Sequence, residues 1–211
     1  MTGPFVAYLA IASQAAPLFA VVVWRRRATG PRAWVLAWCA FLLTMDIVTG
    51  WLGARGVHNL WLYYVLTPVS GALVLWALSL WQPWELARLT FRLAVVPLLL
   101  VWTVLTLAVE DTSAFSQAAE PMAKLVGLGA AAFTLLARSH SASGSLLRHD
   151  WFWVIAGMAL YFGVSSALSP LSALLVGDNP HLLDLAYQLK AVLDITAFFL
   201  IARGMTCQPS T

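Results

Sequence analysis

Charged residues are scarce in this chain of 211 amino acids. Aspartate, glutamate, lysine and arginine together make up 10% of the sequence, whereas hydrophobic residues make up 61%. A soluble globular domain has about 25% charged residues and an apolar fraction near one half. Because so few charges cannot cover a water-facing surface, the composition excludes an ordinary soluble protein. It predicts an integral membrane protein whose main partner is the lipid bilayer.

Cysteine is also rare, and a cleavable leader is not expected. The chain has two cysteines, Cys39 in an apolar segment and Cys207 near the C-terminus. Since we expect them at different depths of the bilayer, we predict no structural disulfide. The apolar segment 4–24 has no basic leader, and Arg25 follows it, which reverses the charge order of a secretion signal. We therefore expect this segment to remain as a helix.

Motifs for catalysis, nucleotides and metals are missing as well. The nucleophile motif G-x-S-x-G does not occur, and a metal or haem site requires ligands that converge. The histidines instead lie at the edges of apolar segments, at His58, His140, His149 and His181. We therefore predict no catalytic residue and no metal site, and no cofactor is indicated. The formal net charge of +3 arises in short loops, where anionic lipids and the insertion machinery account for it, so we expect no nucleic acid partner.

Long apolar segments are what the sequence does contain. A helix that crosses about 30 Å of hydrocarbon needs about 20 residues. Seven segments of this kind run from about 4–24, 33–54, 59–81, 90–109, 117–137, 151–176 and 182–202. They predict an all-α membrane bundle in which residues 1–211 form a single transmembrane domain. The weakest segment is 117–137, because it opens with Glu120, Pro121 and Lys124; without it the number of spans is six.

The arginines predict the orientation of these helices. Lysine and arginine concentrate in cytoplasmic loops of membrane proteins. If the N-terminus lies outside, nine arginines fall on the cytoplasmic side: Arg25, Arg26, Arg27, Arg32, Arg88, Arg92, Arg138, Arg148 and Arg203. The outer connections then carry only Arg55. We therefore predict seven spans with the N-terminus outside and the C-terminus in the cytoplasm.

Tryptophans cluster near the ends of the apolar segments. Indole rings favour the headgroup level of a membrane. The tryptophans in such positions are Trp24, Trp34, Trp51, Trp61, Trp81, Trp84, Trp151 and Trp153. We interpret them as membrane anchors rather than as an aromatic binding site.

One polar stripe stands out on the last segment. At 100° per residue, Asp184, Tyr187, Lys190 and Asp194 fall within about one third of the helix circumference. Lys190 and Asp194 are four residues apart, so they can pair within the helix. A charge inside a bilayer costs at least about 2.5 kcal/mol, so such residues are candidates for function.

Other helices offer polar groups that could complete a buried cluster with this stripe. They are Ser13, Gln14, Asp46, Tyr63, Tyr64, Thr67, Tyr161, Ser165, Ser169 and Ser172. The cluster could bind a ligand, or its members could simply satisfy one another within the bundle. Glu120 and Lys124 form a further four-residue pair, which we predict to be interfacial and inert. Prolines inside the segments, at Pro17, Pro68, Pro97 and Pro170, predict kinks.

Two stretches and the end of the chain resemble a known group. They are His58-Asn59-Leu60-Trp61-Leu62-Tyr63-Tyr64 followed by Thr67-Pro68, Phe152-Trp153 through Gly157 to Tyr161-Phe162, and Ala202-Arg203-Gly204. This pattern resembles small bacterial seven-helix membrane proteins found especially in Bacteroidota. No activity is established for that group. The resemblance therefore implies a topology and no function. We expect the protein in the inner membrane of a bacterial cell.

A more local resemblance is to the microbial rhodopsins. Val192-Leu193-Asp194-Ile195-Thr196-Ala197 is similar to their helix-seven motif, and Thr67-Pro68 is similar to their helix-three motif. The resemblance implies seven helices with the N-terminus outside. The position of the retinal-binding lysine is occupied here by Phe198, and the helix-three carboxylate positions by Leu62 and Leu73. It therefore implies the fold without a retinal Schiff base.

Three functional hypotheses remain open. The first is a non-enzymatic membrane protein, either an accessory subunit of a larger membrane complex or a small sensor or binding bundle. The second is a transporter or intramembrane enzyme that acts on a small amphiphile through Asp46, Tyr187, Lys190 and Asp194. The third is a pigment-binding bundle. The absence of catalytic motifs favours a protein that is not an enzyme.

Overall fold

The computed structural model describes residues 3–25, 28–110, 116–142, 144–178 and 180–207, with the backbone alone described for 3–4, 169–170, 172–178 and 180. Within these residues the chain forms nine α-helices and one short 3-10 helix, and no strand. The predicted all-α class is confirmed. Successive apolar segments run antiparallel to one another, as short connections between long apolar segments require.

The first apolar segment forms two helices rather than one. Helix α1 spans Gly3–Ser13 and α2 spans Ala16–Val23, and their axes differ by 45°. Pro17 explains the break, because it has no N–H to donate to the carbonyl of Ser13 and its ring clashes with that carbonyl. The prediction of a single helix over 4–24 was therefore wrong, whereas the predicted kink at Pro17 is confirmed.

Helices α3 and α4 form a hairpin. Helix α3 spans Pro31–Ala54, and Pro31 occupies its first turn, where a missing N–H costs nothing. Helix α4 spans Trp61–Ser79 and continues through Pro68. Gly56 makes the turn between them with a positive φ of 70°, a conformation that glycine adopts without steric cost.

The fourth apolar segment begins earlier than predicted and is interrupted. Helix α5 spans Glu85–Leu93 and α6 spans Val95–Ala108, whereas the prediction was 90–109. The interruption at Ala94 has the same origin as the break at Pro17, since Pro97 cannot bond to the carbonyl of Leu93. Helix α5 was missed because it carries charges as well as leucines.

The last three long helices agree with the predicted segments within a few residues. Helix α7 spans Ala119–Ser141, and the 3-10 helix η1 spans Leu146–Arg148. Helix α8 spans Asp150–Asp178 without a break at Pro170, and α9 spans Pro180–Thr206. The weakest predicted segment, 117–137, is therefore a regular helix.

Six described helices or helix pairs are long and apolar enough to cross a membrane. They are Pro31–Ala54, Trp61–Ser79, Glu85–Ala108, Ala119–Ser141, Asp150–Leu168 and His181–Thr206. The bent pair α1 and α2 makes a seventh if it counts as one span. The chain is thus a polytopic membrane protein.

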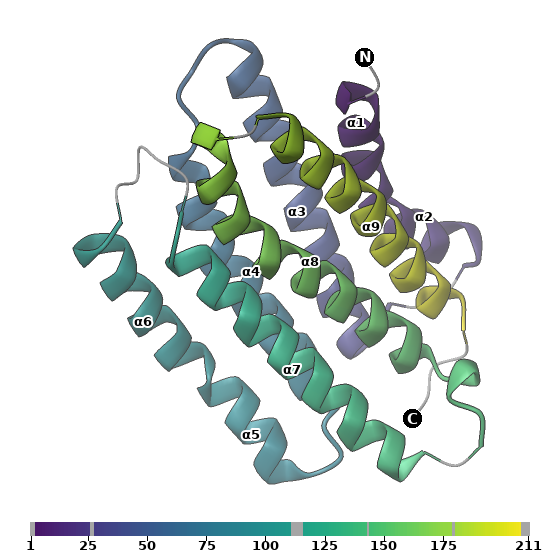
Figure 1. Ribbon diagram of the computed structural model, residues 1–211. Helices are drawn as coiled ribbons and strands as arrows, with labels where there is room; N and C mark the ends of the chain where they lie inside the picture. The colour runs from purple at the N-terminus through teal and green to yellow at the C-terminus, as the bar shows by residue number, and fades with distance from the viewer. Residues whose placement is uncertain (1–2, 26–27, 111–115, 143, 179, 208–211) are drawn as a thin grey trace.

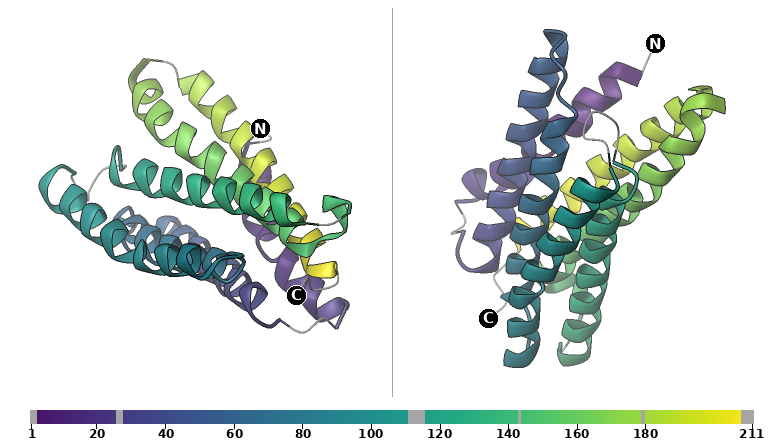
Figure 2. Two further views of the ribbon diagram at one scale, coloured as in Figure 1. Left: turned by 90° about the horizontal axis from the view of Figure 1, so that it is seen from below. Right: turned by 90° about the vertical axis from the view of Figure 1, so that its left-hand side faces the viewer.

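The helices pack around α8 and α4. Helix α8 lies between α7 and α9, α4 packs against α3 and α7, and both α1 and α2 pack against α9 (Figure 1). The C-terminus and the α4–α5 and α7–α8 connections lie at one end of the bundle, opposite the N-terminus. Toward the N-terminal end, the α3–α4 hairpin and the α8–α9 hairpin diverge (Figure 2).

The centre of the bundle is aromatic. The indole of Trp38 lies 5.4 Å from the ring of Tyr161 and 6.1 Å from the ring of Phe198, and its Nε1 donates a 2.7 Å hydrogen bond to Ser70 Oγ. Trp38 and Phe198 are fully buried. This cluster joins α3, α4, α8 and α9.

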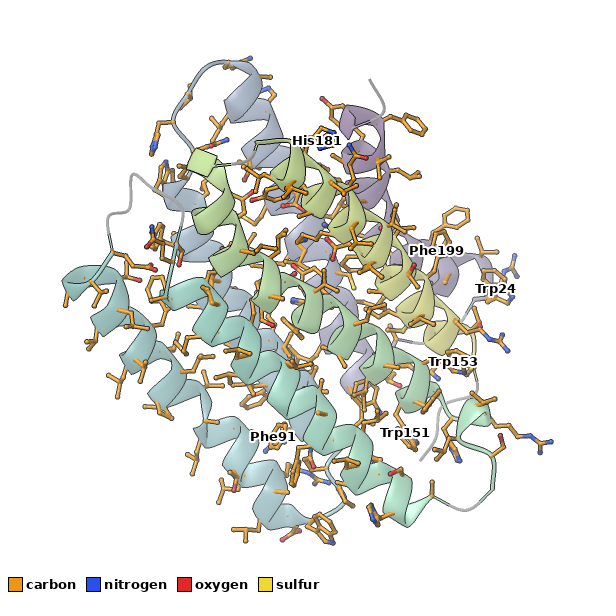
Figure 3. All side chains as sticks on the ribbon, viewed as in Figure 1. Trp24, Phe91, Trp151, Trp153, His181 and Phe199 are labelled. Atoms are coloured by element: carbon orange, nitrogen blue, oxygen red, sulfur yellow. The ribbon has the colours of Figure 1, made fainter. Side chains whose placement is uncertain are left out.

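Two of the tryptophans interpreted as membrane anchors belong to the core. Trp81 and Trp151 are 1% and 2% exposed, so the headgroup interpretation was wrong for both. Trp24, by contrast, projects outward (Figure 3) and is 55% exposed, as an anchor would be. A tryptophan at the end of an apolar segment can therefore face either a neighbouring helix or lipid.

The connection into α7 is organised by Glu110. Its Oε1 accepts hydrogen bonds from the backbone N–H groups of Gln117, Ala118 and Ala119, at 2.8, 2.6 and 3.0 Å. Ser116 Oγ also donates to this carboxylate, at 2.9 Å. Glu110 thus caps the start of α7 from outside the helix, since these N–H groups have no partner within it.

Acid should weaken this cap. Burial alone would raise the pKa of Glu110, but the backbone and hydroxyl hydrogen bonds outweigh it and hold the pKa below its usual value. Because the pKa is depressed in the folded state, the stabilisation is present above the unfolded value of about 4.3 and is lost as pH falls through the folded pKa. We expect the melting temperature of Glu110→Gln to fall less than that of the unchanged protein between pH 6 and about pH 3.

Glu85→Gln is the matched control for this measurement, because Glu85 is exposed in the first turn of α5. Thermal unfolding of the purified proteins in detergent measures the effect. A pH dependence that is the same in Glu110→Gln as in the unchanged protein would contradict the capping role.

Candidate functional site

The structure brings together five of the seven predicted site residues. Asp46 of α3, Tyr63 of α4, Tyr161 of α8, and Lys190 and Asp194 of α9 lie near one another in the half of the bundle closer to the N-terminal end. Gln14, Glu120 and Lys124 join them. We call these eight residues the polar cluster: Gln14, Asp46, Tyr63, Glu120, Lys124, Tyr161, Lys190 and Asp194.

Helix α9 contributes an ion pair to the polar cluster. Lys190 Nζ pairs with Asp194 Oδ2, as their spacing predicted. The side chains are 25% and 11% exposed. The pair is therefore shielded from lipid on most sides while Lys190 stays within reach from one side.

The break between α1 and α2 supplies a second contact. Gln14 lies in this break and is 6% exposed, and its Nε2 donates a 2.6 Å hydrogen bond to Asp46 Oδ2. Asp46 also interacts electrostatically with Lys190, Lys124 and Asp194. Pro17 thus helps to form the site, because the bend that it causes places Gln14 against Asp46 of α3.

Helix α7 contributes Lys124, which sequence reasoning had assigned to an inert interfacial pair. That prediction was wrong, because the side chain of Lys124 is only 6% exposed. Its Nζ donates a 3.3 Å hydrogen bond to Tyr161 Oη and lies 4.0 Å from Glu120 Oε1. Lys124 therefore links α7 to α8 at the centre of the polar cluster.

Small residues on α7 were the signal that could have located Lys124. Ala123, Gly127 and Ala131 are buried at helical spacing, and a Cβ at Gly127 would lie 3.0 Å from the ring of Phe162. They mark the face of α7 that approaches α8 closely. Lys124 follows Ala123 directly, so it lies at the edge of that face.

Tyr161 is held between the two lysines. Lys124 Nζ lies 4.9 Å from the centroid of its ring and Lys190 Nζ lies 5.7 Å from it. Both distances are within the range of cation–π attraction. The aromatic cluster of Trp38 and Phe198 packs against the same ring. Tyr161, Trp38 and Phe198 therefore form an aromatic lining on one side of the polar cluster.

The other two predicted residues do not join the centre. Asp184 is exposed and accepts a 2.7 Å hydrogen bond from Gln188 of its own helix. Tyr187 is 42% exposed and interacts with Tyr63 from the rim. The four residues share one face of α9 as predicted, but Asp184 and Tyr187 are not part of a buried cluster, because α9 diverges there from α3 and α4 (Figure 2).

Two buried acceptors of the polar cluster lack a donor. Gln14 Oε1 and Asp194 Oδ1 accept no hydrogen bond from the described residues. Three carboxylates (Asp46, Glu120 and Asp194) face two ammonium groups (Lys124 and Lys190), which leaves one formal negative charge in excess when all five are ionised. An unsatisfied buried acceptor costs about 1–3 kcal/mol. The polar cluster therefore favours a ligand that carries hydrogen-bond donors or a positive charge.

The polar cluster does not present the set of side chains that a metal site needs. Among the described residues, no three His, Cys, Asp or Glu side chains group closely enough to hold one. Comparison with known proteins adds no candidate: no protein-family model matches the chain, and neither a curated protein nor a solved structure is detectably similar to it. The function therefore has to be inferred from the polar cluster itself.

Proposed function

We propose that this chain is a seven-span binding or sensor bundle of the bacterial inner membrane, and that it holds a small amphiphile in the polar cluster without transforming it. The head of the amphiphile carries a protonated amine or hydroxyl groups. Its apolar part lies among the membrane-spanning helices. The N-terminus lies outside and the C-terminus in the cytoplasm.

The convergence of ionisable groups carries this proposal. Five charged side chains from α3, α7 and α9 meet around Tyr161, and two acceptors among their neighbours remain without donors. Such groups are costly within a bilayer unless they pair or serve a ligand. Because Gln82 Oε1, outside the polar cluster, also lacks a donor, the two open acceptors support a ligand through their position beside the converging charges.

The distribution of arginines supports the orientation. Arg88, Arg138 and Arg148 flank the connections at the C-terminal end of the bundle (Figure 1). Arg26 and Arg27 lie outside the described residues. With the bent pair α1 and α2 counted as one span, the spans number seven, and seven crossings would leave the two ends of the chain on opposite sides of the membrane.

The placement of Phe198 argues for a ligand other than covalently bound retinal. Phe198 packs against Trp38 and Tyr161. A Schiff base needs a lysine, and Lys190 lies two turns away on α9 and pairs with Asp194. The resemblance to rhodopsins supports the arrangement of helices alone.

The test uses two aspartates on the same helix. We expect a small molecule to co-purify in fixed ratio with the gently extracted protein, and mass spectrometry identifies it. Asp194→Asn should lower its occupancy at least about tenfold, because a charge-assisted hydrogen bond contributes about 1.5–3 kcal/mol. Asp184→Asn should leave the occupancy unchanged, since Asp184 is exposed.

Three other outcomes would overturn the proposal. Equal occupancy in the two variants would show that the ligand does not bind in the polar cluster. A protein partner in fixed ratio, with no small molecule, would make the chain an accessory subunit whose cluster is structural. Uptake or turnover of an amphiphile that disappears in Asp194→Asn would make it a transporter or an enzyme.

A further inference from the structure

The break between α1 and α2 contains buried acceptors that have no donor. Ser13 ends α1 and Gln14 lies in the break, and they are 7% and 6% exposed. No described residue donates a hydrogen bond to the backbone carbonyl of either residue or to Gln14 Oε1. For Ser13 the reason is Pro17, which has no N–H to donate to the carbonyl four residues before it. Buried backbone carbonyls are nearly always paired, so those of the break are exceptional.

These acceptors lie beside the charges of the polar cluster. Gln14 Nε2 donates to Asp46 Oδ2, so Oε1 of the same amide lies next to this carboxylate. Asp46 in turn interacts electrostatically with Lys190 and Asp194 of α9, and both α1 and α2 pack against that helix (Figure 1). Asp194 Oδ1 is a further buried acceptor without a donor. The break, α3 and α9 therefore bring their open acceptors to one region of the bundle.

A broken helix inside a membrane is suited to binding a ligand. Hydrocarbon offers no hydrogen-bond donor, so irregular backbone is tolerated there only where it is buried in protein or lines a polar cavity. Membrane transporters bind substrates and ions at such breaks, where freed backbone carbonyls coordinate cations. The C-terminal end of α1, at Ser13, also carries the partial negative charge of a helix dipole. The break therefore favours a cation.

Charge and the number of donors together select the head of the ligand. The polar cluster has one formal negative charge in excess. A protonated primary amine carries one positive charge and three N–H donors. A hydroxyl group lacks the charge, and a quaternary ammonium group lacks the donors. The primary amine alone among these heads matches both the charge of the polar cluster and its open acceptors.

We infer that the ligand is an amphiphile with a protonated primary amine, and that the break between α1 and α2 recognises its N–H groups. The carbonyl of Ser13, Gln14 Oε1 and Asp194 Oδ1 accept its hydrogen bonds, and Asp46 supplies the opposite charge. This inference rests on the proposed function, because it specifies the head of the molecule that the polar cluster binds. Gln14 is then a specificity-determining residue, and Pro17 is a positioning residue that keeps the carbonyl of Ser13 open.

The experiment compares three probes that share one alkyl chain: dodecylamine, dodecyltrimethylammonium and dodecanol. Native mass spectrometry of the full purified chain measures how tightly each probe binds. We expect dodecylamine to bind at least about tenfold more tightly than either of the others, because it alone combines a positive charge with several N–H donors.

Two variants test the break, and each has a matched control. Gln14→Leu removes the amide oxygen and should weaken dodecylamine binding about tenfold. Gln188→Leu should not, because Gln188 also donates to an aspartate but lies outside the polar cluster. Pro17→Ala supplies an N–H to the carbonyl of Ser13 and should weaken dodecylamine binding about fivefold. Pro97→Ala is its control, because the break between α5 and α6 carries no residue of the polar cluster.

A second readout separates recognition of the amine from a general disturbance of the site. Binding of dodecyltrimethylammonium should be unchanged in Gln14→Leu and in Pro17→Ala, since this probe has no N–H group for the break to accept. Thermal unfolding of each variant shows whether it is folded.

Several results would overturn the inference. Equal affinity for the three probes would show that the amine is not recognised, and unchanged dodecylamine binding in folded Gln14→Leu and Pro17→Ala would exclude the break. Equal weakening of dodecylamine and dodecyltrimethylammonium would make Gln14 a structural residue. Each of these results leaves the proposed function intact while Asp194→Asn still lowers the occupancy of the co-purified molecule. An occupancy that Asp194→Asn does not change rejects both.

Discussion

Replacing Gly157 by leucine should prevent the bundle from assembling. A Cβ at this position of α8 would lie 2.5 Å from the carbonyl oxygen of Ala197 and 2.7 Å from Cγ1 of Ile201, both on α9. Backbone atoms cannot give way as a flexible side chain can, so the two helices would have to separate. Helices without a glycine at such a contact cannot approach one another this closely.

The smaller change Gly157→Ala gives a measurable effect. Overpacking costs about 1–3 kcal/mol, and we expect the free energy of unfolding to fall by at least that amount. Titration of the purified protein with denaturing detergent, followed by tryptophan fluorescence, measures it. Gly129→Ala is the control, because a Cβ there meets nothing within 4 Å; it should be neutral or stabilising by up to about 1 kcal/mol. Equal losses in the two variants would show that α8 and α9 are not so close.

The spans could be predicted from the sequence because hydrocarbon thickness imposes a length on every apolar segment. The segment 33–54 became Pro31–Ala54, and 182–202 became Pro180–Thr206. Breaks within segments were predictable where proline removes a donor early in a helix, as at Pro17. They did not follow proline everywhere, since α4 continues through Pro68.

The composition of the polar cluster could be predicted only in part. Lys190 and Asp194 were found because their spacing on one helix is a local property. Lys124 was missed because hydropathy does not indicate how α7 is rotated about its axis or which helix lies beside it. Its hydrogen bond to Tyr161 joins residues 37 positions apart, and such a contact depends on the packing of α7 against α8.

The outer end of α9 shows the converse error. Periodicity places Asp184 on the same face as Asp194, but a shared face becomes a shared site only where a neighbouring helix covers it. Helix α9 leaves α3 and α4 toward its first residues (Figure 2), so Asp184 is exposed whereas Asp194 is 7% exposed. The divergence of the two hairpins therefore decides which polar residues belong to the cluster.

The same divergence bears on how the polar cluster could be reached. Lys190 and Glu120 keep 25% and 26% of their side chains exposed, whereas Lys124 keeps 6%. Asp46 of α3 is partly exposed as well, so the accessible charges lie on α3, α7 and α9, and Lys124, which is the more buried of the two lysines, contacts Tyr161. A ligand that arrived from the N-terminal end would meet Glu120 and Lys190 first. Under the proposed function, the ligand would enter from this end of the bundle.

Replacing Arg32 by methionine should destabilise the opposite end of the bundle strongly. Arg32 is 3% exposed in the first turn of α3. Its Nε and Nη2 bind Asp150 Oδ2 at the start of α8, both at 2.8 Å, and Nη2 also donates to the carbonyl of Cys207 at 2.9 Å. One guanidinium thus joins α3, α8 and the end of the chain. Removing one member of a buried pair costs about 3–5 kcal/mol, because the remaining charge stays buried.

A double-mutant cycle separates this charge effect from a loss of packing. Asp150→Leu added to Arg32→Met removes the second charge, so we expect the double variant to recover much of the lost free energy of unfolding. Arg148→Met is the control, since Arg148 is exposed, and it should unfold like the unchanged protein. A double variant that is no more stable than Arg32→Met would mean that the carbonyl of Cys207, rather than Asp150, depends on the guanidinium. Arg32 would then serve mainly to hold Cys207, which directly follows α9, in place.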